Sequence, residues 1–454
     1  MSGYSYGNQG LSGKRLYIIV AVWLILVIAG GFCTWYGWFG PGSSEEEQPT
    51  AEATPTTEEI VAPTPTPQAM AAQPTSTTAA APPTVPVEEE VFGYGIAING
   101  TGGGDINYWM GQVESLGLGW VKQQVRWAHF EDTPGEMDWS GFDALVDAAN
   151  IRDIKVMFSV VDAPAWSRPT YSDADPQGAP PDDLTVFADF LGRLVERYQG
   201  RIHAIEVWNE QNLDREWDTA EGVNAERYVE MLRLAYQTIK SLDPNIIVVS
   251  GALSPTGVNC NVSFPECPPE GRPIIRDDFV YFEEMIAAGF LDSCDCVGAH
   301  HNGINMPPNV AWDEGYNDPT AQFRGPFDDP DHSWSFKSTL WGYHERIAAA
   351  GSDKPLCITE FGWATSEGFP GYPDVYPPGF GFAIDNTLEE QAQWDAEAFR
   401  LMREWGFVRL AFLWNLNYSQ LGWGPEDPNA PYALIDFNGA PRPAFSVIGA
   451  MPKP

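Results

Sequence analysis

Strand-like apolar runs alternate with helix-period segments along the whole chain after residue 91, and this alternation constrains the fold more than any other feature. The eight runs expected to be strands are 92–99, 120–127, 154–161, 202–210, 245–254, 296–302, 355–363 and 408–418. The helical segments expected after them lie near 105–118, 139–152, 182–199, 225–242, 277–290, 336–350 and 388–404, and RPAFSVIGAM closes the ring. Eight such pairs predict an α/β fold, a (β/α)8 or TIM barrel over residues 91–454.

The connections are unequal in length. Long segments rich in Gly, Pro, Asp and aromatic residues follow four of the strands, at 162–181, 255–276, 303–334 and 364–386, whereas the segments that lead into strands are short. Long loops after the strands build the walls of a site in a barrel of this kind. The sequence therefore predicts a functional site at the carboxyl ends of the strands.

The first 90 residues differ in composition from the rest. Residues 16–39 run for 24 residues without a charge, and at about 1.5 Å per residue they are long enough for a transmembrane helix. Lys14 and Arg15 precede them, which predicts a cytoplasmic tail over 1–15 and the remaining chain outside the cell. Residues 40–90 are rich in Pro and Thr and predict a disordered linker. A cleaved signal peptide is the alternative to a retained anchor.

The charge balance restricts the partners. With 25 Lys plus Arg against 62 Asp plus Glu, the formal net charge is -37, which repels phosphate backbones, so nucleic acid is not expected as a partner. The 18 Trp, 17 Tyr and 24 Phe offer wide aromatic faces that suit sugar rings, although a role in core packing is the alternative for any one of them.

Two of the expected strands end in a glutamate. IEVWNEQNL (205–213) places Asn209 and Glu210 at the end of the fourth strand, and the seventh strand ends in Glu360. In a closed barrel these carboxylates would face each other across the mouth. Strict pleating would send Asn209 and Glu210 to opposite faces, so the backbone must leave strand geometry there if both act on one ligand.

With these residues the sequence resembles the retaining glycoside hydrolases of clan A, and EVWNEQNL is most similar to family 39 and its cellulase-like relatives. The resemblance covers roughly residues 91–450. It implies that Glu210 is the acid/base, with Asn209 beside it, and that Glu360 in ITEFGW is the nucleophile. It further implies substrate-binding roles for Arg126 in QVRW, His300 in VGAHHN and Trp414 in FLWN.

The physical chemistry of the residues agrees with what the resemblance implies. Cleavage through an oxocarbenium-like state needs one carboxylate to attack and another to donate a proton. We expect Arg126 to lie near Glu360 and keep it ionised, and Glu210, shielded by Trp208, to hold its proton nearer neutral pH. The alternatives are ion-pair partners at the barrel rim for both glutamates and an ordinary salt bridge for Arg126.

Several tryptophans lie in the rim segments. Trp166 and Trp363 are expected to bind sugar, and some of Trp217, Trp312, Trp334 and Trp423 should also stack on sugar rings.

The cysteines and histidines give no metal-binding spacing, because neither CxxC nor HExxH occurs. We therefore expect neither metal nor cofactor. A pair of metal ligands at His300 and His301, or a calcium ion on the acidic run 327–332, is the alternative. We expect a disulfide between Cys260 and Cys267, and buried thiols at Cys294, Cys296 and Cys357.

The predicted protein is a membrane-anchored, outward-facing retaining β-glycosidase that acts on a poly- or oligosaccharide, with endo action and a monomeric state expected. An exo-acting β-xylosidase-like hydrolase or a transglycosylase is the alternative among enzymes. A surface carbohydrate-binding protein without turnover is the alternative of another class.

Overall fold

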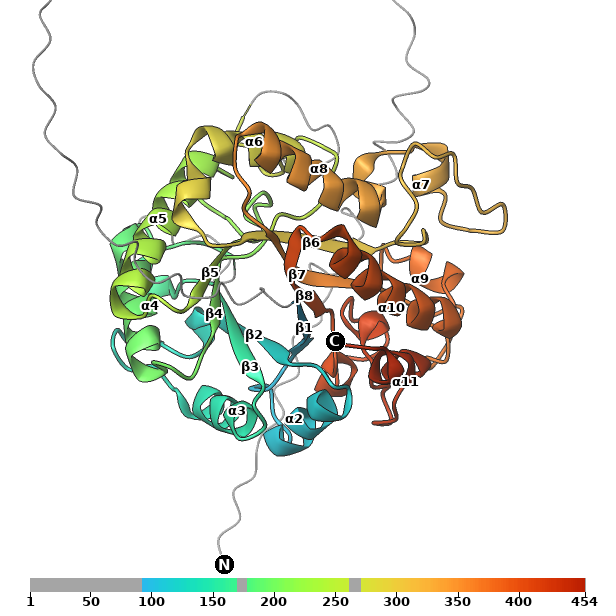
Figure 1. The fold of residues 1–454 in the computed structure, drawn as a ribbon, viewed down its shortest axis with the longest axis horizontal. Coiled ribbons are helices and arrows are strands. Elements are labelled where there is room, and N and C mark those ends of the chain that lie inside the picture. The colour runs from blue at the N-terminus through green and yellow to red at the C-terminus, as the bar shows by residue number, and fades with distance from the viewer. Residues whose placement is uncertain (1–91, 170–177, 261–270, 454) are drawn as a thin grey trace, which may run out of the picture.

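Eight parallel strands form the centre of the structure, a computed structural model that describes residues 92–169, 178–260 and 271–453 (Figure 1). The strands are β1 Gly93–Ile98, β2 Trp120–Arg126, β3 Lys155–Val161, β4 Ala204–Val207, β5 Ile247–Ser250, β6 Val297–Gly303, β7 Leu356–Trp363 and β8 Val408–Leu413. Neighbours pair in the order β5-β4-β3-β2-β1-β8-β7-β6, and a parallel bridge between Val249 and Cys296 joins the two ends. The predicted (β/α)8 barrel is confirmed.

A ring of helices surrounds the strands (Figure 1). The helix that follows each strand in turn is α2 Ile106–Ser115, α3 Ser140–Asn150, α4 Leu184–Arg197, α5 Ala225–Leu242, α6 Asp278–Ala287, α8 Phe336–Ala349, α10 Leu388–Trp405 and α11 Pro443–Ala450. The short helices α7 Gly325–Asp328 and α9 Phe382–Asp385 lie within the long loops after β6 and β7. Asp105, Asp183, Asn224 and Thr387 cap their helices, because each side chain accepts a backbone N–H that the first helical turn leaves unpaired.

The inside of the barrel is apolar at one end and charged at the other. Trp120, Met157, Cys296 and Cys357 belong to a cluster of buried side chains near the amino ends of the strands. One inward-facing position further along β2, the fully buried Lys122 replaces an apolar side chain. A polar layer therefore lies under the carboxyl ends of the strands, where the long loops are.

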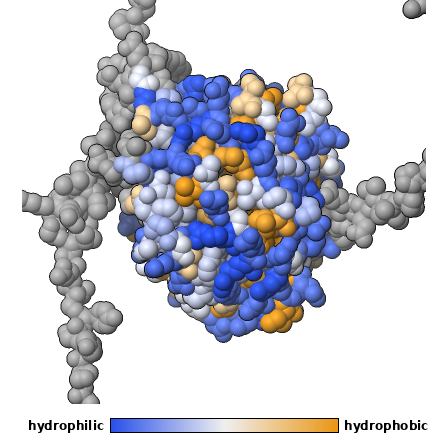
Figure 2. Space-filling view, turned by 90° about the vertical axis from the view of Figure 1, so that its left-hand side faces the viewer, coloured by the Kyte–Doolittle hydropathy of each residue, from blue (hydrophilic) through white to orange (hydrophobic). Residues whose placement is uncertain are grey.

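The side that carries α4 and α5 is largely hydrophilic, with only small groups of hydrophobic residues (Figure 2), as the acidic composition leads one to expect.

The predicted tail, apolar span and linker at 1–15, 16–39 and 40–90 lie outside the described residues. Within the described residues, no helix has the length and hydropathy needed to cross a membrane.

A disulfide joins β6 to β7 inside the barrel. Cys296 and Cys357 are bonded, with a Cα–Cα distance of 5.8 Å, which corrects the expectation that both are free thiols. Cys296 directly precedes β6 and Cys357 lies near the start of β7, and both belong to the buried inner cluster, a pairing that a sequence separation of 61 residues conceals. Cys294 is a free, buried thiol as expected. Cys260 is disulfide-bonded, while its expected partner Cys267 lies outside the described residues.

Removal of the Cys296–Cys357 bond is expected to lower the free energy of unfolding by about 4 kcal/mol, because the unfolded chain regains the entropy of an open loop of 61 residues. Urea denaturation of Cys296→Ala/Cys357→Ala measures this loss. Cys294→Ala is the matched control, since it removes a buried thiol that closes no loop. Equal losses in the two variants would contradict the assignment of the bond.

Candidate active site

The chain leaves strand geometry immediately after β4. Trp208 and Glu210 have φ values of 76° and 43°, a left-handed region that residues other than glycine seldom adopt and that recurs at functional sites. The Glu210 N–H donates to the Ala252 carbonyl at 2.8 Å, and the buried Trp208 ring donates to the Glu216 carbonyl at 2.7 Å. The expected departure from pleating at Asn209 and Glu210 is thus confirmed.

Glu360 lies on β7, opposite β4, with a side chain that is 9% exposed. Its neighbour Thr359 faces the barrel interior, where its hydroxyl donates to Glu206 at 2.5 Å. An irregular register with β8 between Ile358 and Phe361 lets consecutive residues share the inner side of the barrel. The Glu360 side chain therefore lies at the rim and still points to the inner side of the barrel.

The cation in contact with Glu360 is Lys122, not Arg126. The Lys122 ammonium lies 3.1 Å from Glu360 Oε1 and 3.0 Å from Glu206 Oε2. Arg126, four residues further along β2, pairs with Asp162 at 2.6 Å, and its side chain is 35% exposed. The expectation that Arg126 accompanies Glu360 is therefore corrected, and Arg126 lies at the rim between β2 and β3.

The sequence did not predict the role of Lys122 in the site, because a lysine within a strand is usually expected to be exposed. The signal was available in the pleat: Trp120, Lys122, Gln124 and Arg126 share one face of WVKQQVR, and the barrel turns that face inward. Glu206 lies in the same way in the middle of β4 and is fully buried. A lysine and a glutamate at mid-strand in a barrel sequence predict a buried ion pair.

His300 bridges the two glutamates. Its Nδ1 lies 3.3 Å from Glu210 Oε1, and its Nε2 lies 3.9 Å from Glu360 Oε1. The ring is buried, with 1% of its side chain exposed. Burial alone lowers the pKa of His300, but the nearby Glu360 and the hydrogen bond with Glu210 outweigh it and raise the pKa above its usual value. Glu210, just after β4, and Glu360, on β7, thus approach the same imidazole from opposite sides of the ring, and Glu206 Oε1 also lies 3.9 Å from its Nε2.

The protonation of Glu210 differs from the expectation. Burial raises its pKa, but the Arg215 guanidinium, 2.5 Å from Oε2, and the hydrogen bond with His300 lower it to about 2. Glu216, six residues further on, has the opposite balance, since burial raises its pKa to about 8 against the opposing charge of Arg215. Near neutral pH both shifts, and the closer contact of Arg215 with Glu210 (2.5 Å) than with Glu216 (3.9 Å), favour an ionised Glu210 and a protonated Glu216.

Asn209 lies next to Glu210 and is 6% exposed. Among the described residues, its Oδ1 atom has no hydrogen-bond partner although it is buried. A buried amide oxygen without a partner is uncommon in proteins. The group is consequently available to a ligand hydroxyl at the mouth.

The three tryptophans predicted to bind sugar differ in how far they are buried. Trp414 packs against Tyr418, with ring centroids 4.7 Å apart, beside the buried Tyr432. The half-buried Trp166 donates its ring N–H to the Glu131 carbonyl at 2.9 Å. Trp363 is 1% exposed and packs on Phe336, which corrects the expectation that it binds sugar.

The other four tryptophans of the rim segments also differ in exposure. Trp217 is buried against Trp208, with ring centroids 5.6 Å apart, and is part of the core. Trp312 and Trp423 are 42% and 61% exposed and remain available for stacking. Trp334 is partly buried and donates to the Asp329 carbonyl at 3.0 Å.

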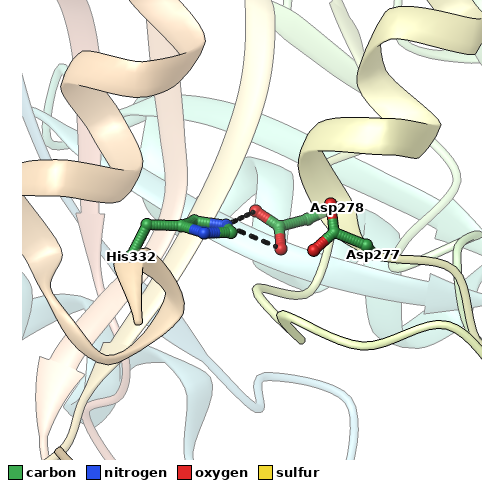
Figure 3. Close-up of side chains that lie close together, drawn as sticks. All are labelled: Asp277, Asp278 and His332. Atoms are coloured by element: carbon green, nitrogen blue, oxygen red, sulfur yellow. Dashed lines mark hydrogen bonds and ion pairs between the residues drawn. The ribbon is translucent and has the colours of Figure 1, made fainter. Parts of the chain in front are cut away.

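One further cluster, Asp277, Asp278 and His332, brings ligand-type atoms within 4.8 Å of one another (Figure 3). Its imidazole faces the Asp278 carboxylate, with Nε2 3.2 Å from both oxygens, and Nδ1 lies 3.2 Å from Asp331 Oδ1. A protonated imidazole satisfies both contacts, because each ring nitrogen then donates to a carboxylate. We therefore assign this cluster to an ion pair that holds the loop before α8 against α6.

This ion pair is expected to make stability depend on pH. Burial lowers the pKa of His332, but hydrogen bonds to Asp278 and Asp331 raise it to about 9, above the value of roughly 6.5 in an unfolded chain. The charged imidazole then stabilises the fold by roughly 3 kcal/mol below pH ~6.5, and this contribution is lost as the pH rises through about 9.

The measurement is the difference in free energy of unfolding between the native chain and His332→Gln, by urea denaturation from pH 6 to pH 10. We expect a difference that is largest at the acid end and small at the alkaline end. His344→Gln, which replaces a histidine stacked on Phe407, is the matched control. A difference that stays constant with pH would refute the charged state.

Fold and site together define a (β/α)8 barrel with two carboxylates converging at the carboxyl ends of its strands. No family model matches the chain, and no curated protein matches it. Among solved structures, it is similar to a family 39 glycoside hydrolase from Bacteroides cellulosilyticus, with a TM-score of 0.56 and 16% identity over 80% of this chain. The chain spans 64% of that protein's length.

Two other solved structures are similar. A family 39 β-xylosidase from Caulobacter crescentus has a TM-score of 0.51 at 19% identity, with 80% of this chain and 71% of that chain covered. A glucosidase from Croceicoccus marinus has a TM-score of 0.52 at 11% identity, with 80% and 68% covered. At these identities the likeness shows a shared fold.

Proposed function

We propose that the barrel hydrolyses β-glycosidic bonds of a poly- or oligosaccharide and retains the anomeric configuration. The observation that carries this proposal is the contact of one imidazole, His300, with both Glu210 and Glu360 at the mouth of the barrel. The similarity to a family 39 hydrolase, a β-xylosidase and a glucosidase supports it. We infer membership of the clan A enzymes, and of family 39 within them, from the same residues.

In the proposed reaction, Glu360 attacks the anomeric carbon and Glu210 protonates the departing sugar oxygen. The Lys122 ammonium lies 3.1 Å from Glu360 Oε1 in a site shielded from water, and would hold that side chain in position for attack. In the second step Glu210 takes a proton from water, which attacks the covalent glycosyl intermediate. Asn209 would hold a sugar hydroxyl, and Trp414 and Trp166 would contact the ring faces.

We expect the first product of turnover to have the anomeric configuration of the substrate. Retention follows from direct attack by Glu360, whereas a general base that activates water from a distance inverts the configuration. Proton NMR of the anomeric signal within the first minutes of turnover, before mutarotation, measures this. An initially inverted sugar would refute the nucleophile assignment.

Endo action at the cell surface is the form of the proposal that the chain favours. Four long loops follow β3, β5, β6 and β7, which suits an open cleft more than a closed pocket. An exo-acting β-xylosidase-like hydrolase or a transglycosylase with the same two glutamates is the second candidate, supported by the similar β-xylosidase. Product lengths from β-glucans, xylans and mannans distinguish random internal cleavage from release of single units.

The location is part of the proposal. The uncharged run 16–39, preceded by Lys14 and Arg15, would anchor the chain, and 40–90 would hold the barrel outside the cell as a monomer. A surface carbohydrate-binding protein is the competing function. Release of reducing sugar from the polysaccharide panel separates the two, because a binding protein releases none.

A further inference from the structure

Arg215 places one guanidinium between two carboxyl groups of the same loop. Its Nη2 lies 2.5 Å from Glu210 Oε2, and its Nε lies 3.9 Å from Glu216 Oε1. The Arg215 side chain is 65% exposed, while those of Glu210 and Glu216 are 11% and 14% exposed. The cation can therefore move in solvent, and the two carboxyl groups are held by the protein.

The main chain under these side chains is fixed. The Trp217 N–H donates to the Leu213 carbonyl at 2.9 Å, and the Asp218 N–H donates to the Gly178 carbonyl at 2.8 Å. A Cβ atom on Gly178 would lie 1.7 Å from the Arg215 carbonyl oxygen, so the two backbones are in close contact. Movement of Arg215 is consequently confined to its side chain.

This contact conflicts with the first step of the proposed reaction. A general acid must carry a proton, and an arginine paired with Glu210 opposes that proton. Glu216 carries the proton instead, since its pKa is raised to about 8 by burial and also by the charge of Glu210, whereas that of Glu210 is lowered to about 2. The contacts agree, because Arg215 lies 2.5 Å from Glu210 and 3.9 Å from Glu216, so the free protein favours the proton on the glutamate that is not the proposed general acid.

We propose that Arg215 is a positioning residue that moves from Glu210 to Glu216 when a saccharide enters the mouth, so that the proton of Glu216 passes to Glu210. This inference rests on the proposed function. The net charge of the three groups is zero before and after the move, because Glu216 loses the proton that Glu210 gains. Water at the mouth carries the proton, since both carboxyl groups are partly exposed.

The other charged groups of the mouth do not replace Arg215. His300 from β6 and the buried Tyr432 face Glu210, and Glu360 from β7 lies on the other side of His300 and acts on Arg215. Arg126 and Asp162 face Glu216. The Arg126 guanidinium is paired with Asp162 at 2.6 Å.

Lys122 is also unable to move to Glu216. Its side chain is 1% exposed and lies between Glu206 and Glu360. Arg215 is thus the cation whose exposure and reach allow it to serve both Glu210 and Glu216.

The first test uses the free, full-length protein and requires no substrate. Carboxyl carbon NMR follows the titration of Glu210 and Glu216 in the native chain and in Arg215→Ala. We expect the midpoint of Glu210 to rise by about 1 to 3 pH units in the variant, because an opposite charge within hydrogen-bond distance is removed. Arg227→Ala, which removes an arginine that pairs with Glu221, is the matched control. A midpoint of Glu210 that does not move overturns the inference.

The second test is kinetic and uses two substrates of the sugar that the polysaccharide panel identifies. A disaccharide needs its leaving group protonated, and the p-nitrophenyl glycoside does not. We expect Glu216→Gln to lower kcat/KM for the disaccharide at pH 7 by at least about tenfold and to move its alkaline limb to lower pH, with a smaller effect on the nitrophenyl substrate.

Suppression distinguishes this role from a structural one. Adding Arg215→Ala to Glu216→Gln is expected to restore part of the lost activity and to return the alkaline limb, because Glu210 then keeps its own proton. An unchanged pH profile in Glu216→Gln, or a double variant no better than the single one, overturns the inference. A native chain that cleaves no glycoside refutes the proposed function instead, and the NMR titration still decides the role of Arg215.

Discussion

Glu360→Gln is expected to lower kcat by at least about 10⁴-fold on any substrate that the native chain cleaves. The amide cannot form the covalent glycosyl intermediate, and removal of the nucleophile in another covalent hydrolase costs on the order of 10⁶-fold. Glutamine has the same shape as glutamate, and Lys122 still pairs with the carboxylate of Glu206 at 3.0 Å. The fold should therefore persist. Initial rates with the p-nitrophenyl glycoside measure the loss, and thermal unfolding checks the fold.

The matched control is Glu314→Gln, which removes a surface carboxylate paired with Lys337 at 2.8 Å and should leave kcat unchanged. Binding of the polysaccharide should survive in Glu360→Gln. Residual activity within tenfold of the native chain would show that another group attacks the anomeric carbon. The proposed mechanism would then be wrong even if the protein is a glycosidase.

Lys122→Met is expected to lower the free energy of unfolding by about 3 to 5 kcal/mol, because it leaves Glu206 and Glu360 buried without their counter-charge. Burial lowers the pKa of Lys122, but Glu206 and Glu360 outweigh it and raise it above its usual value, so the residue is a cation in the native state. Urea denaturation at pH 7 measures the loss. The loss should shrink at lower pH, because protonated carboxyl groups need no cation.

Two controls accompany this variant. Lys122→Met/Glu206→Met removes a second buried charge and should recover part of the lost stability. Lys337→Met breaks an exposed ion pair with Glu314 and should cost less than about 1 kcal/mol. A loss in Lys122→Met that is no larger than in Lys337→Met would mean that the buried network does not stabilise the barrel.

Much of the barrel could be predicted because each of its elements repeats a local pattern. The helix expected at 225–242 matches α5, and the strand expected at 355–363 begins one residue before β7. Errors concentrate where a strand meets the site: the fourth strand was expected to continue to 210, but β4 ends at Val207. There the left-handed backbone at Trp208 replaces the extended pattern that the apolar run indicates.

The side-chain partners of the site were harder to predict. Arg126 was expected beside Glu360 on the strength of a motif. Lys122 takes that place instead, because it lies on the same inward face of β2 four residues earlier, deeper in the barrel. The pairing of Cys296 with Cys357 and the contact of Arg215 with Glu210 were not foreseen either. Each joins groups whose distance depends on how strands and loops are placed in three dimensions.

By itself, the amino-acid sequence determined the eight βα pairs, the end of the barrel that carries the long loops, and the position of Glu210 and Glu360 at strand ends. Periodicity and turn residues encode these features locally, so they can be predicted without the tertiary structure. Only the tertiary structure decided which cation neutralises Glu360, which glutamate holds a proton and which cysteines are bonded. Electrostatic and covalent pairing depend on distances of a few ångströms between residues far apart in the chain, and closure of the barrel sets those distances.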